Sequence, residues 1–209
     1  MAITTLAELK TALAVEASRS DITWDDYITR GESRLNRKLR LLQQETTTAL
    51  TLSADASTIT LPTAFVSHID LFYTTDNYQP TQQSWTDLQM TASTGTGRPN
   101  NYALADKIYF ERSADQEYAM KQRYYAKWDL GTDSANWLLT NAPDAYIYSS
   151  LMAFYMRGKN PDGIAQNRAL LDEVITELNT VDGQSRGKAK MAVDPGIVQT
   201  SRFNITRGY

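Results

Sequence analysis

The hydrophobic pattern of this chain changes its period twice. Near both ends, apolar residues recur at spacings of three and four, which is typical of one face of an α-helix. From residue 46 to about residue 127, β-branched and aromatic residues alternate with polar ones, as in strands. This order predicts an α+β fold that is mainly helical: a four-helix bundle (residues 1–45 and 133–183) carries a β-rich insertion (46–132), and residues 184–209 form an extended C-terminal arm.

The first two helices are predicted at residues 5–18 and 23–44. Thr4 or Thr5 would cap the first, with Glu8 completing a capping box. The second has an apolar stripe made of Trp24, Ile28, Gly31, Leu35, Leu39 and Leu42. On the opposite side, the same spacing predicts a basic face made of Arg30, Arg34, Arg37 and Lys38.

The insertion is predicted to be a small antiparallel sheet or sandwich. Its candidate strands are residues 46–52, 58–61, 66–73, 101–104, 107–110 and 117–127. Residues 53–57 resemble a hairpin loop between the first two strands, and residues 85–90 a single helical turn.

The last two helices follow residue 133. Asn141 is predicted to cap the third, with Pro143 at its start and Gly158 at its end. Its apolar residues surround the whole circumference, which indicates burial on several sides. The fourth helix is predicted to begin at Asn160 and to end at Gly183.

The predicted arm differs from the rest of the chain in charge. Residues 184–209 carry +4 and the remainder −7, within a total of −3. The basic residues are Arg186, Lys188, Lys190, Arg202 and Arg207, and the apolar residues spaced among the last of them are Phe203, Ile205 and Tyr209. This pattern suits an arm that adds to a partner's groove or sheet edge. A frayed terminus is the alternative.

Two segments carry a family likeness. GESRLNRKLR (31–40) resembles the "ARLNRRLR" second-helix signature of tailed-bacteriophage head–tail adaptors (connectors), and NWLLTNAPDAYIYSSL (136–151) resembles their "NWLL..YPDLYLYGAL" third-helix entry. RSD (19–21) and LPTAF (61–65) also match, so the likeness covers roughly the first 180 residues in order. The chain is thus similar to podovirus-type portal adaptors.

The resemblance implies a structural protein of the virion without cofactors. It implies a ring of about twelve copies that joins the portal to the tail, with a DNA channel through the ring. In this interpretation the arm binds the portal, and tail or nozzle proteins bind the opposite face. The basic face would contact passing DNA, without sequence preference, or an acidic partner. A solvated face with intrahelical pairs, for example to Asp26, is the open alternative, and a nucleic-acid-binding module is the alternative function.

The residues point to no catalytic site. The chain has no cysteine, which excludes disulfides and thiolate metal sites, and His68 is its only histidine, without a nucleophile at a catalytic spacing. The glycines in TGTGRP (94–99) lack the ending of a phosphate-binding loop. Residues 123–128 interleave basic and aromatic residues, as single-strand binders do. Alternation on a strand, with the aromatic side chains packed inward, produces the same pattern and is the favoured interpretation.

The expected site of synthesis is the host bacterial cytoplasm. The first residues lack the basic region and apolar run of a signal peptide. No apolar stretch approaches the ~18 residues of a membrane span.

Overall fold

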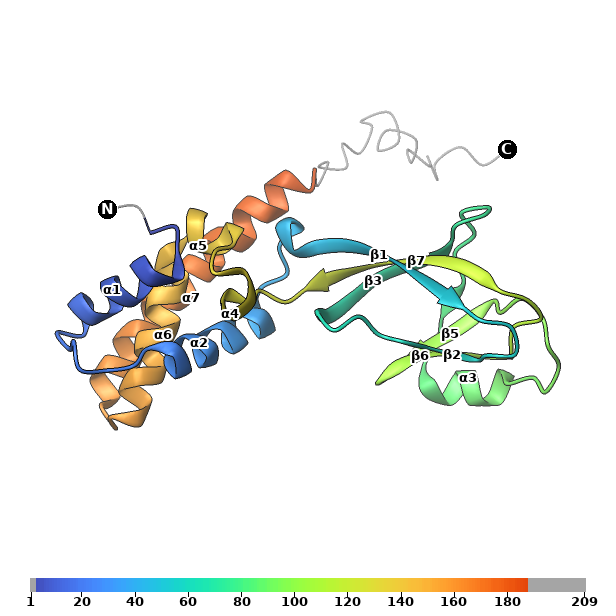
Figure 1. The fold of residues 1–209 in the computed structure, drawn as a ribbon, viewed down its shortest axis with the longest axis horizontal. Helices are drawn as coiled ribbons and strands as arrows, with labels where there is room; N and C mark the ends of the chain where they lie inside the picture. Colours follow the sequence, from blue (N-terminus) through green and yellow to red (C-terminus); the bar gives the residue numbers. More distant parts are fainter. Residues whose placement is uncertain (1–2, 188–209) are drawn as a thin grey trace, which may run out of the picture.

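The computed structural model describes residues 3–187, which form a helical bundle and an elongated β-rich insertion beside it (Figure 1). The bundle contains α1 (Leu6–Glu16), α2 (Asp25–Lys38), α6 (Pro143–Arg157) and α7 (Pro161–Ser185). Helix α6 is central, because α1, α2 and α7 all pack against it. The α+β fold class predicted from the sequence is confirmed.

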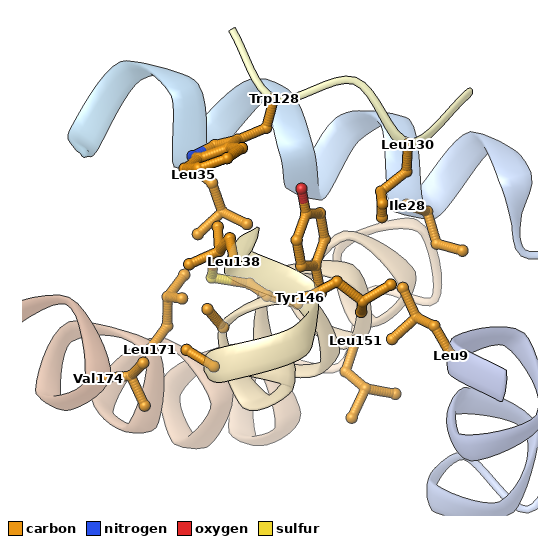
Figure 2. Close-up of a cluster of buried hydrophobic side chains, with 14 of the residues drawn as sticks. Leu9, Ile28, Leu35, Trp128, Leu130, Leu138, Tyr146, Leu151, Leu171 and Val174 are labelled. Atoms are coloured by element: carbon orange, nitrogen blue, oxygen red, sulfur yellow. The ribbon is translucent and has the colours of Figure 1, made fainter. Parts of the chain in front are cut away.

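Buried apolar residues from all four helices meet in one core (Figure 2). Two short helices, α4 (Leu130–Asp133) and α5 (Trp137–Asn141), add Leu130, Leu138 and Leu139 to it. Within this core the Glu32 carboxylate accepts hydrogen bonds from the backbone N–H of Leu130 (2.9 Å) and from the hydroxyl of Tyr146 (3.0 Å). These bonds tie α2 to the chain that returns from the insertion.

The predicted start of the first helix is confirmed. Thr5 caps α1, and Glu8 completes the capping box by accepting the backbone N–H of Thr5.

The predicted course of the second helix is wrong beyond Lys38. Leu39 is extended (φ −93°, ψ 140°), and only a short 3-10 turn, η1 (Leu42–Gln44), follows. Leu39 and Leu41 are buried at alternate positions of this extended segment, whereas Leu42, predicted in the apolar stripe, is 41% exposed. An extended segment presents every second residue to the core, so the helical spacing failed there.

The predicted third helix is present as α6, and a short helix that was not predicted, α5, precedes it. Asn136 caps α5 by accepting the N–H of Leu139 (2.9 Å), while Asn141, the predicted cap, is the last residue of α5. Pro143 begins α6 as predicted, and it forces the break because its ring disfavours a helical residue before it. The predicted end at Gly158 and the restart at Asn160 are confirmed.

Helix α7 is longer than predicted. It continues past Gly183 to Ser185. A Cβ at Gly183 would meet no atom within 4 Å, and its backbone is not left-handed. Nothing at this glycine requires the helix to end.

The insertion consists of two sheets (Figure 1). The first is antiparallel, with the order β1-β7-β3: β1 (Glu45–Leu52), β7 (Tyr118–Ala126) and β3 (Phe65–Tyr73). The second has the order β2-β6-β5-β4: β2 (Thr58–Thr60), β6 (Lys107–Phe110), β5 (Asn101–Leu104) and β4 (Thr81–Gln82). The six predicted strands are all present, and β4, which pairs in parallel with β5, was not predicted.

The predicted hairpin between β1 and β2 is wrong. β1 pairs with β7 and β2 pairs with β6, so residues 53–57 connect two different sheets. Leu52 before the turn and Ile59 after it enter one core with Leu71, Tyr102, Ile108 and Met120. Burial of both apolar side chains between the sheets competes with pairing of the neighbouring strands. The predicted helical turn is present as α3 (Trp85–Thr91).

Candidate functional site

The most distinctive surface of the described chain is a cationic groove between α2 and α6. It is a hollow of about 550 Å³ lined by Arg30, Ser33, Arg34, Arg37, Ala153, Met156 and Arg157. We call it the arginine groove. Its four guanidinium groups come from two helices that are distant in sequence.

The close packing of α2 on α6 places these arginines beside α6. At Gly31, an added Cβ would lie 2.7 Å from Oγ of Ser149 and 3.0 Å from the backbone nitrogen of Ser150. Glycine therefore allows the two helices to approach closely. Ile28 and Leu35 are buried on the same side of α2. The arginines on the adjoining side of α2 therefore lie along the edge of α6, where they line the groove.

The groove continues toward α7. An adjoining hollow of about 440 Å³ is lined by Arg34, Arg37, Lys38, Met152, Arg168, Leu171 and Asp172. Lys38 Nζ lies 2.5 Å from a carboxylate oxygen of Asp172. Within residues 3–187, by contrast, no carboxylate lies within 4.0 Å of Arg30, Arg34 or Arg37.

Arg34 shows the consequence of this uncompensated charge. Its guanidinium is half-buried and lies against the sulfur atoms of Met152 and Met156. Burial lowers the pKa of Arg34, and repulsion by Arg37 and Arg168 lowers it further. The groove therefore has a positive potential that favours an anionic partner.

The predicted basic face is thus only partly as expected. Arg30, Arg37 and Lys38 are exposed, but Arg34 is half-buried at the edge of α6. The intrahelical pair with Asp26, suggested as an alternative, is not among the ion pairs of residues 3–187. Arg157 and Arg168 were missed, because they lie on other helices and no spacing along the chain links them to α2.

Arg186, predicted to belong to the extended arm, is attached to the folded body. Its guanidinium donates to Glu45 (2.6 Å), to the carbonyl of Arg40 (3.2 Å) and to Asp182. The bond to Asp182, followed by the bond to Glu45, raises the pKa of Arg186. The other predicted arm residues, Lys188, Lys190, Arg202, Phe203, Ile205, Arg207 and Tyr209, lie outside the described residues.

His68 joins the two sheets of the insertion. Its Nε2 lies 2.6 Å from the hydroxyl of Tyr102, and its Nδ1 lies 3.4 Å from Nε2 of Gln122. Burial lowers the pKa of His68, against the attraction of Asp70. The Asp70 carboxylate bonds to Arg123 (2.6 Å). His68 therefore occupies a packed, hydrogen-bonded position between sheets.

The two other candidate motifs also have structural surroundings. Arg98 of the glycine-containing loop pairs with Asp76 (2.7 Å) and stacks on Tyr73 and Tyr78. In β7, Tyr124 is buried while Arg123 is exposed, so the alternation of basic and aromatic residues follows the strand. Among residues 3–187, no group of three or more acidic or histidine side chains is arranged to hold a metal ion.

No helix of the described part is long and apolar enough to cross a membrane. No curated protein matches the chain. The family model described as SU10 adaptor protein matches residues 4–194, which cover the whole bundle and the whole insertion. The chain therefore belongs to the SU10 adaptor protein family and is a structural adaptor of a bacteriophage.

Proposed function

We propose that this protein is a head–tail adaptor that joins the portal to the tail. The family match over residues 4–194 carries the proposal, because it spans both the bundle and the insertion. About twelve copies would form a closed cyclic ring below the portal and surround the channel for DNA. The protein would be made in the host cytoplasm and would end in the virion.

The proposed mechanism is recognition, without catalysis or cofactors. The residues after Gly187, which carry Lys188, Lys190, Arg202, Phe203, Ile205, Arg207 and Tyr209, would bind the portal. Tail or nozzle proteins would bind the opposite face. The free protein would be mainly monomeric, because the described helices bury their apolar faces within one subunit. The portal would then serve as the template for the ring.

The test is a phage that lacks this chain. We expect DNA-filled heads without tails, seen by electron microscopy, and tailed particles when the chain is supplied separately. Tailed particles that form without the chain would disprove the adaptor role. Native mass spectrometry of the purified protein, alone and mixed with portal, would give the copy number.

The arginine groove supports one alternative function, a nucleic-acid-binding module that uses Arg30, Arg34, Arg37 and Lys38. Guanidinium groups without carboxylate partners would suit phosphates. A salt-dependent shift of DNA in a gel by the monomer would favour this function, with an affinity that falls steeply as salt rises.

A further inference from the structure

A second charged surface lies on α7, away from the helices that it packs against. Leu171, Val174 and Ile175 are buried toward the core. Glu173 and Glu177 are exposed and lie one turn apart, and at ~100° per residue they project away from that buried side. We call this surface the acidic face of α7.

The acidic face lacks partners within residues 3–187. Neither Glu173 nor Glu177 forms an ion pair or a side-chain hydrogen bond there. The two arginines nearest in sequence point elsewhere, because Arg168 lines the hollow beside α2 and Arg186 bonds to Glu45 and Asp182. Val181, 59% exposed, lies one turn beyond Glu177. Among residues 3–187, one subunit therefore has an unpaired acidic surface as well as an unpaired basic groove.

We propose that the arginine groove of one subunit receives the acidic face of α7 of a second copy of this chain. The proposal rests on the proposed function, in which copies assemble as a ring. Each subunit would offer its groove to one neighbour and its α7 to the other. Such a head-to-tail contact uses two different surfaces, and it closes into a ring when the rotation between copies allows.

The spacing of the charges supports this partner. Arg30 and Arg34 lie one turn apart on α2, as Glu173 and Glu177 do on α7. Guanidinium groups bind carboxylates through two parallel N–H···O bonds. The two arginines on successive turns of α2 would therefore pair with the two glutamates on successive turns of α7 across the interface.

The floor of the groove favours a protein partner over DNA. Met156 is 51% exposed between the arginines, and a methionine offers apolar contact to a helix with an exposed valine such as Val181. Residues 1–183 carry a net charge of −7, which opposes approach of a polyanion to the rest of the body. The acidic face of a single helix, by contrast, would contact only the basic groove and not the negatively charged remainder of the body.

The test exchanges the charges on the two surfaces in the full-length chain. One variant carries Arg30→Glu and Arg37→Glu, and the other carries Glu173→Arg and Glu177→Arg. All four positions are exposed, so melting temperatures should remain near that of the wild type. Lys107→Glu with Lys121→Glu is the matched control, because both lysines are exposed on the insertion, form no ion pair within residues 3–187, and give the same change in net charge as the groove variant.

Each variant is supplied to the phage that lacks this chain, and tailed particles are counted. We expect each exchanged variant alone to lower the count at least about tenfold, because like charges would face each other across every contact. The two variants supplied together should restore the count, since their copies can alternate around a ring. A single chain that carries all four substitutions should also restore it, and the lysine control should assemble normally.

Several results would overturn the inference. Normal assembly by either exchanged variant alone would do so, and so would failure of the mixture and of the fourfold variant. Normal assembly of the groove variant with loss of salt-dependent DNA binding would assign the groove to DNA. Failure of the adaptor role itself is distinguishable, because the wild-type chain would then be dispensable for tailed particles.

Discussion

Gly31 of α2 faces Ser149 of α6 so closely that a methyl group added at Gly31 would lie 2.7 Å from the Ser149 hydroxyl oxygen. This contact sets the distance between the two helices that form the arginine groove. Alanine at position 31 would gain helix propensity of about 1 kcal/mol. It would also have to displace Ser149 and the backbone at Ser150.

We predict that Gly31→Ala lowers the free energy of unfolding by about 1–2 kcal/mol, because overpacking of this crossing outweighs the gain in helix propensity. Urea denaturation measures the change. The double variant Gly31→Ala with Ser149→Ala is the control, since it removes the nearest atom and should recover part of the loss. If Gly31→Ala is more stable than the wild type, the helix crossing has room that the structure does not show.

The second prediction concerns Glu32, which accepts hydrogen bonds from Leu130 and Tyr146 in the bundle core. Burial raises the pKa of Glu32 above its usual 4.5. The stability linked to the protonated acid is therefore present below pH 4.5 and is lost as the pH rises through the folded-state pKa. Glu32→Gln keeps an acceptor oxygen but carries no charge. We therefore expect the melting temperature of Glu32→Gln minus that of the wild type to be larger at pH 7 than at pH 4.

Glu32→Leu separates the charge from the hydrogen bonds. It removes the acceptor and leaves the Leu130 N–H and the Tyr146 hydroxyl short of a partner, at a cost of ~1–3 kcal/mol. Equal pH profiles for the wild type and Glu32→Gln would show that Glu32 does not titrate in this range.

The third prediction concerns His68, whose pKa is lowered by burial from its usual 6.5. Because the unfolded chain takes up the proton first, the stability linked to neutral His68 is full above pH 6.5 and is lost as the pH falls through the folded-state pKa. His68→Gln should flatten the decline of melting temperature between pH 7 and pH 5. It should leave tailed-particle assembly intact, and loss of assembly at an unchanged melting temperature would point to a direct functional role.

The fourth prediction compares two truncations around Arg186. Removal of the residues after Gly187 should leave the melting temperature unchanged and abolish binding to the portal. Removal of the residues after Gly183 also deletes Arg186, which bonds to Glu45, Arg40 and Asp182 where α7 meets the start of β1. We expect this longer truncation to lower the free energy of unfolding by about 1–2 kcal/mol relative to the shorter one, because charged hydrogen bonds are lost at a partly exposed site.

Arg186→Ala in the full-length chain is the matched control for these truncations. It should show the stability loss of the longer truncation with portal binding retained. A truncation after Gly187 that still joins portal rings would disprove the portal-binding role of the arm.

Local chemistry made much of the fold predictable. The capping box of Thr5 and Glu8, Pro143 at the start of α6 and Asn160 before α7 act through neighbouring backbone groups, and each was confirmed. The β-rich segments were also found, because strand alternation is a local pattern. Likewise, the basic residues of α2 could be grouped because they share one helix.

The tertiary structure decided what depends on partners distant in sequence. β1 pairs with β7 rather than with β2, because Leu52 and Ile59 are buried between two sheets. Arg157 and Arg168 join the arginines of α2 only where α6 and α7 pack beside it. Arg186 lies against the folded body because its guanidinium forms ion pairs with Glu45 and Asp182. Sequence spacing records contacts within one element, whereas the core and the groove depend on how elements pack together.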